Sequence, residues 1–180
     1  MTDADDQLIR QRAAALRIFT LTLIVGVIAI TCVLMVILFM VLEGKPLAEF
    51  GPVPVLSLLA VAIAIVGLAG SFAMPARVRR ARAEQFATGI PLPGGPGEST
   101  VSRLASAYSA SHILGMALAE GPALMGVVFF LIEGHWLALL PLGFGILAMI
   151  WKFPSEAALR EWVEARLAEA PDQPSKPIHP

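Results

Sequence analysis

A single carboxylate lies inside an otherwise uncharged apolar run. Glu120 is the only ionisable residue between positions 113 and 132, and a helix of that length can cross a hydrocarbon core of about 30 Å. A charged carboxylate at that depth costs at least ~2.5 kcal/mol, so the neutral acid is favoured, and a neutral acid can carry a proton. The pattern predicts either proton or cation handling by Glu120 or a protonated side chain that hydrogen-bonds within the bundle.

Two further residues define the surroundings expected for this carboxylate. Pro122 has no N–H, so the carbonyl oxygen of Leu118 loses its helical partner and is free to bind a cation or accept the proton of the acid. Thr31 lies at a similar depth in the first apolar run, and we expect its hydroxyl to hydrogen-bond protonated Glu120. Such a bond would hold two helices together without any transport.

Two polar residues precede Glu120 along the same helical stripe. Tyr108, His112, Met116 and Glu120 follow one another at every fourth position, so they share a slowly drifting face of one helix. This stripe predicts a proton entry path that starts at His112. The alternative is that Tyr108 and His112 anchor the helix at the membrane interface.

The residues around these side chains form four apolar runs. The chain has 180 residues, of which 57% are hydrophobic and only 15% charged, and this composition is more apolar than a soluble domain requires. About 20 apolar residues suffice for one crossing, so we expect transmembrane helices over residues 18–42, 53–74, 113–132 and 136–151. The predicted fold is all-α: a polytopic membrane protein whose four-helix transmembrane bundle occupies residues 18–153.

Basic residues flank these runs on one side of the membrane. Arginines precede the first run and lie between the second and third, and Lys152 follows the fourth, whereas Lys45 is the only basic residue in the other two connections. Basic residues in short connections favour the cytoplasmic side. The sequence therefore predicts a protein of the inner membrane with both termini in the cytoplasm.

The segments outside the runs differ in character. Residues 1–17 and 154–170 have amphipathic patterns, and we expect short cytoplasmic helices that lie along the membrane or bind a partner protein. The Gly/Pro-rich segment 88–98 is predicted to be a flexible linker, after which Ser99 or Thr100 caps the third helix. Four prolines in residues 171–180 predict a disordered tail.

A group of arginines follows the second run. Arg77, Arg79, Arg80 and Arg82 are expected to face anionic head groups or a partner protein, and Trp162 suits the same layer. Simple determinants of membrane orientation would have the same pattern. Small residues at helical spacing in the second and third runs, such as Gly67 and Ser71, indicate close helix packing and allow a homo-oligomer.

The motifs of catalysis and of metal or nucleic-acid binding are missing from the sequence. It contains no Gly-x-Ser-x-Gly, His-Glu-x-x-His or Cys-x-x-Cys motif and no phosphate-binding Gly-Lys-Ser/Thr. The net charge of −1 gives no electrostatic footprint for nucleic acid. Cys32 is the only cysteine, so no disulfide can form within the chain. We predict no enzymatic activity, no cofactor and no metal.

Residues 115–126, with the sequence GMALAEGPALMG, resemble the carboxylate-bearing helix of the proteolipid c subunit of rotary ATPases. This local resemblance implies that Glu120 binds and releases a translocated proton. The wider layout has an Ala-x-x-Glu-Gly-Pro-Ala third helix and the segment Phe-Pro-x-x-x-x-Leu-x-x-Trp-Val-Glu at residues 153–164. It is similar to small uncharacterised four-span proteins of bacterial inner membranes, a resemblance that implies a location and no activity.

The sequence predicts an accessory or structural membrane component in which Glu120 is a neutral, hydrogen-bonded residue of the bundle. A proton- or cation-linked transport element with Glu120 as the carrier is the second hypothesis. Regulation through a partner that binds the arginine segment or the C-terminal helix is the third. The partners expected are the lipid bilayer and either a second copy of the chain or another membrane protein.

Overall fold

The chain folds into helices joined by short connections. The computed structural model describes residues 2–43, 45–47, 54–90, 92, 93, 95 and 97–169. The helices are α1 (Asp3–Met40), α2 (Val55–Ala87), α3 (Thr100–Glu133), the short 3-10 helix η1 (Trp136–Leu139), α4 (Leu140–Trp151) and α5 (Glu156–Ala168). Within the described residues there is no strand, and the all-helical prediction is confirmed. The predicted tail 171–180 and the start of the second run at Val53 lie outside the described residues, and the predicted linker 88–98 is described only in part.

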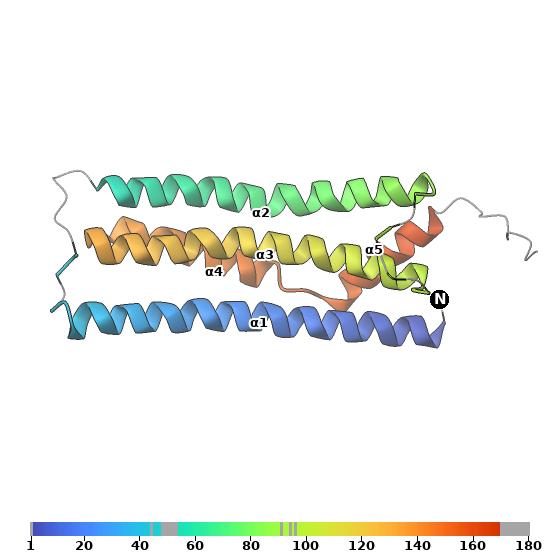
Figure 1. The fold of residues 1–180 in the computed structure, drawn as a ribbon, viewed down its shortest axis with the longest axis horizontal. Helices are drawn as coiled ribbons and strands as arrows, with labels where there is room; N and C mark the ends of the chain where they lie inside the picture. Colours follow the sequence, from blue (N-terminus) through green and yellow to red (C-terminus); the bar gives the residue numbers. More distant parts are fainter. Residues whose placement is uncertain are drawn as a thin grey trace, which may run out of the picture.

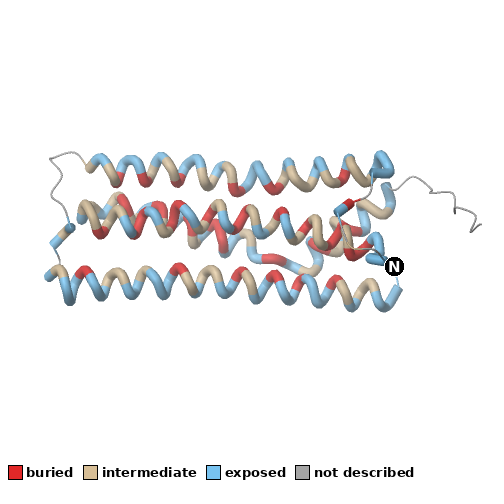
Figure 2. The backbone as a smooth tube through the Cα atoms, in the orientation of Figure 1, coloured by how far each residue is buried: buried red, intermediate tan, exposed pale blue. Residues whose placement is uncertain are grey.

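Helix α3 is the central element of the bundle. It contacts every other helix, and its most extensive contact is with α2. Helices α1 and α3 run in one direction, and α2 and α4 run in the other (Figure 1). Figure 2 shows that buried residues gather along α3 and on the sides of α1 and α2 that face it. Helices α1 and α3 begin and α2 ends at one end of the bundle, and α5 lies at this end too. Most arginines lie there, so this end is called the basic end below.

Three helices, α1, α2 and α3, are long and apolar enough to cross a membrane. A fourth is counted if η1 with α4 and the following α5, which are bent by 62° at a short break, are taken as one span. Only 11% of an 18-residue apolar stretch of α1 is buried in the bundle. Side chains such as Val25, Val33 and Phe39 are largely exposed. An exposed apolar surface of this extent is compatible with a membrane location.

The long helices continue beyond their apolar segments at the basic end. Helix α1 has 38 residues, which corresponds to about 57 Å, well beyond the ~30 Å hydrocarbon core. Within the predicted segment 1–17, residues 3–17 are therefore no separate helix along the membrane, as the sequence suggested, but the first turns of α1. Its start is fixed by a capping box, in which Thr2 accepts from the N–H of Asp5 and the Asp5 carboxylate accepts from the N–H of Thr2.

Helix α5 packs back onto this extension. Its apolar residues Leu159 and Val163 are 1% and 0% exposed. They belong to the basic-end core, a cluster from α1, α3, α5 and the connection before α3, formed by Ile9, Ala13, Leu16, Leu92, Val101, Leu104, Ala105, Tyr108, Leu159 and Val163. The apolar stripe predicted to face lipid or a partner is thus covered by the chain itself, because burial against α1 and α3 removes it from water.

Ion pairs tie α5 to α1 at the edge of this core. Arg160 lies 2.8 Å from Asp6 and 3.5 Å from Glu156, and Arg10 lies 3.7 Å from Glu156. The Arg17 Nε also donates to the carbonyl oxygen of Pro154, at 3.2 Å. Because these groups are partly exposed, they orient α5 more than they stabilise it.

The end of α3 supplies the cap for the start of α2. Helix α2 has no capping side chain of its own. The carboxylate of Glu133 accepts from the backbone N–H groups of Leu56 and Ser57, at 3.1 and 2.7 Å, and from the Ser57 hydroxyl. A carboxylate at a helix N-terminus satisfies the free N–H groups and matches the helix dipole.

We predict that Leu159→Ala lowers the free energy of unfolding by about 2–5 kcal/mol, the usual cost of truncating a fully buried leucine. Chemical denaturation of the purified protein in detergent measures this change. Glu161→Ala, at an exposed position of the same helix, is the control and should change it by less than ~0.5 kcal/mol. Equal effects of the two variants would show that α5 does not pack on the bundle in solution.

Candidate functional site

The two interior prolines make α2 and α3 fit each other. Pro122 of α3 leaves the Leu118 carbonyl oxygen without its helical N–H. A Cβ added to Gly67 of α2 would lie 3.1 Å from that oxygen and would overlap the Pro122 ring. Only glycine at position 67 therefore allows α2 to cover the exposed carbonyl, where Cα–H groups can contact it.

The same arrangement occurs a second time with the roles of the helices exchanged. Pro75 of α2 leaves the carbonyl oxygen of Ser71 without its helical N–H. A Cβ added to Gly115 of α3 would lie 2.8 Å from the Pro75 ring and 3.1 Å from the Ser71 oxygen. Each helix thus contributes one proline and one glycine to the contact, and the close packing predicted for Gly67 and Ser71 is found here.

Helix α4 approaches α3 through glycines as well. A Cβ on Gly145 of α4 would lie 2.7 Å from the Ala123 side chain and 2.9 Å from the carbonyl oxygen of Ala119. These residues adjoin the mid-bundle core, a second cluster of Val27, Met116, Ala119, Ala123, Ala148 and Met149. The face of α3 that meets α4 near the level of Glu120 is therefore packed with small and apolar side chains.

Glu120 lies half-buried on α3, and among the described residues its carboxylate has no hydrogen-bond or ion-pair partner. The bond expected from Thr31 is not formed. The Thr31 hydroxyl donates instead to the Val27 carbonyl of its own helix, at 2.7 Å, since a threonine inside a helix can always reach back one turn. The carbonyl freed by Pro122 faces Gly67, so it is used in helix packing.

The stripe that leads from Tyr108 to Glu120 is interrupted. Tyr108 is buried and packs against Trp162 with the two rings tilted by 54° and 5.7 Å between their centroids. His112 Nε2 lies 3.3 Å from the Thr20 hydroxyl of α1. Met116, the next position, is fully buried and apolar. The structure brings His112 to α1 but does not connect it to Glu120 by polar groups.

Polar groups gather at the basic end, where α2, α3 and the end of α4 meet. A cavity of about 220 Å³, called the polar cavity below, is lined there by charged and polar side chains together with apolar ones. Its polar lining is Ser71, Arg79, Tyr108, His112, Lys152 and Ser155, and no carboxylate is among the described lining residues. The Arg79 guanidinium lies over the Tyr108 ring, 5.6 Å from its centroid.

Lys152 also lines this cavity, whereas in the sequence its charge indicated only the orientation of the chain in the membrane. Its ammonium group donates to the Ser71 carbonyl freed by Pro75 and, at 2.7 Å, to the Ser71 hydroxyl, and it lies 3.9 Å above the Phe72 ring. Burial of the ammonium, and then the positive charge of Arg79, lower the pKa of Lys152 to about 8. A proline inside a helix leaves the carbonyl oxygen four residues before it without a partner. This relation, which identifies Leu118 from Pro122, also identifies Ser71 from Pro75.

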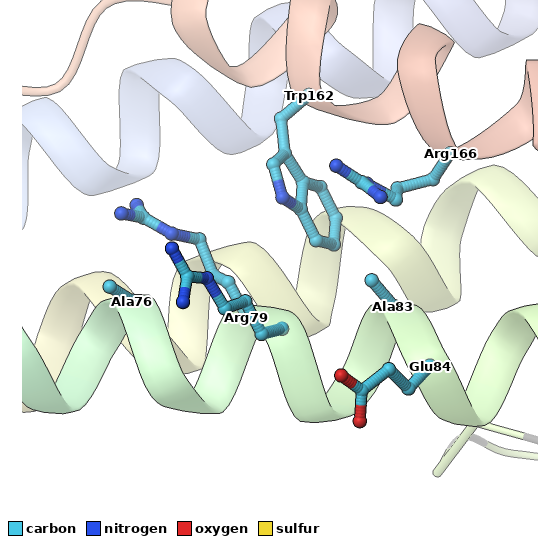
Figure 3. A pocket seen from close by; sticks show the side chains of 7 residues that line it. Ala76, Arg79, Ala83, Glu84, Trp162 and Arg166 are labelled. Atoms are coloured by element: carbon cyan, nitrogen blue, oxygen red, sulfur yellow. The ribbon is translucent and has the colours of Figure 1, made fainter.

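A second cavity of about 290 Å³ lies between α2 and α5 and shares Arg79 with the first. Figure 3 shows Arg79 and Trp162 pointing toward each other from the two helices, Arg166 beside Trp162, and Glu84 turned away. Arg80 also lines this cavity. The other two predicted arginines lie elsewhere: Arg77 is exposed, and Arg82 donates to Gln85 at 3.0 Å. Trp162 and two of the four arginines are therefore brought together.

A third cavity is apolar. A groove of about 650 Å³ runs along α2 and α3 and is lined by Ala62, Ile63, Val66, Gly67, Ala117, Leu118, Gly121, Pro122 and Met125. Glu120 is not among these residues. Within the described part of the chain, no three His, Cys, Asp or Glu side chains gather in a way that could hold a metal ion.

Compared with known protein families, with curated proteins and with solved structures, the chain has no match. Its function therefore has to be argued from its own residues, and the two resemblances noted in the sequence stay predictions.

We predict that Gly67→Ala lowers the free energy of unfolding by about 1–3 kcal/mol, the usual cost of adding a methyl group to a tight contact. The matched control is Gly70→Ala, one turn further along α2, where the new Cβ would meet Leu118 at an ordinary 3.8 Å. Thermal or chemical unfolding in detergent compares the two variants. If Gly70→Ala were the more damaging change, the packing described for α2 and α3 would be incorrect.

Proposed function

We propose that the protein is a four-span membrane protein of the inner membrane, with both termini in the cytoplasm, that serves as an accessory or structural component. In this proposal Glu120 is a neutral acid within the bundle and carries no transported proton or cation. The fourth span is η1 with α4, which lies antiparallel to α3.

The distribution of charge supports this orientation. The start of α1, the end of α2, the start of α3 and all of α5 lie at the same end of the molecule (Figure 1). Arginines occur on each of these segments, whereas Lys45 is the only described basic residue at the opposite end. Since basic residues are retained on the cytoplasmic side, the basic end is the cytoplasmic end.

The isolation of Glu120 is the observation that carries the structural role. Among the described residues it has no polar partner, and residues 121–132, which separate it from Glu133 at the end of α3, contain no polar side chain. On the near side Met116 separates it from His112, which is engaged with Thr20. A carrier needs access from both sides of the membrane, and the polar residues here form no such route.

A topology experiment tests the membrane arrangement. We expect reporters fused to the N- and C-termini to be accessible only from the cytoplasm, because the described part of the chain starts and ends at the basic end. A reporter inserted near Lys45 is the control and should be accessible only from the other side. Termini on opposite sides would rule out an even number of spans and with it the proposal.

Glu120→Gln separates a structural acid from a carrier. Glutamine keeps the shape and the hydrogen-bonding capacity of the protonated acid but cannot titrate, so we expect the variant to fold with an unchanged thermal midpoint. Proton flux into liposomes should match that of empty vesicles for both the wild-type protein and the variant, with an added ionophore as the control for vesicle integrity. Flux through the wild-type protein that disappears in Glu120→Gln would establish transport and refute the structural role.

A further inference from the structure

The polar cavity has the composition of an anion site. Arg79 and Lys152 both line it, no described lining residue is acidic, and neither cation takes part in an ion pair with a described residue. Cations without an ion-pair partner that face one cavity repel each other; the pKa of Lys152 is lowered by burial and, secondly, by the charge of Arg79. An anion placed between them would remove this cost.

Donors are also available in the cavity. An ammonium group has three N–H donors, and Lys152 uses two of them on the oxygens of Ser71, so the third has no described hydrogen-bond acceptor, although the group lies over the Phe72 ring. Arg79 donates to no described residue and is held in place over the Tyr108 ring. A planar guanidinium in a fixed position, with an ammonium group nearby, suits the oxygens of a phosphate group.

The surroundings of the cavity indicate where that phosphate comes from. Phe72, Trp151 and Phe153 line the same cavity and are 51%, 86% and 41% exposed. Lys152 directly follows α4, and Ser71 lies near the end of the apolar segment of α2. In the proposed orientation this is the level at which head groups meet acyl chains, and aromatic side chains are common at that level.

We infer that the polar cavity binds the phosphate group of an anionic phospholipid of the cytoplasmic leaflet, with Arg79 and Lys152 as its ligands and the acyl chains alongside Phe72, Trp151 and Phe153. The inference rests on the proposed membrane orientation. A lipid bound there would contact α2, α3 and the end of α4 together, and so would join the three elements that meet at this cavity.

The experiment compares lipids and two neighbouring arginines. Thermal unfolding of the full-length protein in detergent is followed while phosphatidylglycerol, phosphatidylcholine with the same acyl chains, or inorganic phosphate is added. We expect phosphatidylglycerol alone to raise the midpoint of the wild-type protein. Arg79→Gln should weaken the apparent affinity for phosphatidylglycerol roughly tenfold or more, as expected for the loss of one charge-assisted hydrogen bond.

Arg77→Gln is the matched control, because Arg77 lies on the same helix, is exposed and lines neither cavity. It should leave the affinity within about twofold, the change expected from a distant surface charge. Lys152→Gln should weaken binding as Arg79→Gln does, and Lys152→Arg should restore it. Each variant is judged by the rise that lipid produces over its own midpoint, so a change in basal stability does not obscure the result.

Four outcomes would overturn the inference. Equal losses in Arg77→Gln and Arg79→Gln would indicate diffuse attraction to a charged surface. An equal response to phosphatidylcholine would show that no anion is recognised, and a full response to inorganic phosphate would assign the site to a soluble ligand. If the terminal reporters give the expected topology while phosphatidylglycerol has no effect, the lipid site alone is refuted and the proposed function stands.

Discussion

Two helices with interior prolines lie against each other in this bundle, and the rest of the structure follows from the way they fit. A proline inside a helix leaves a carbonyl oxygen without a partner, and in a membrane no water can replace it. Here the oxygen of Leu118 is covered by Gly67, and the oxygen of Ser71 is covered by Gly115 and bound by Lys152. The backbone defect of each helix is thus corrected by the other, and the two are held in one register.

This register decides where polar groups can lie. Because Gly115 sits on Pro75, the end of α2 is set beside the first part of α3, and Arg79, Tyr108 and His112 face one cavity. Because Gly67 packs against Pro122, α2 covers the oxygen freed there, which is therefore not available to a cation. The two proline–glycine contacts between α2 and α3 therefore place polar side chains together at the basic end and leave Glu120 with no polar partner among the described residues.

The sequence predicted the helical class and the apolar runs, because hydropathy is a local property. It predicted amphipathic stripes at both ends but not their partners, since whether Leu159 and Val163 meet lipid or Ile9 and Leu104 depends on contacts between distant segments. The predicted hydrogen bond between Thr31 and Glu120 is absent for the opposite reason, because the Thr31 hydroxyl donates to the Val27 carbonyl of its own helix. Lys152 was identified only as a charge, although Pro75 marks its acceptor in the sequence.

The carboxylate of Glu133 gives the order of synthesis a structural consequence. Ribosomes make chains from the N-terminus, so all of α2 exists before the residue that caps its first turn, which lies 76 positions beyond Ser57. Until then the amide groups of Leu56 and Ser57 lack the carboxylate that accepts from them in the folded protein. The N-terminal cap of α2 therefore forms only after α3 has been synthesised and lies beside α2.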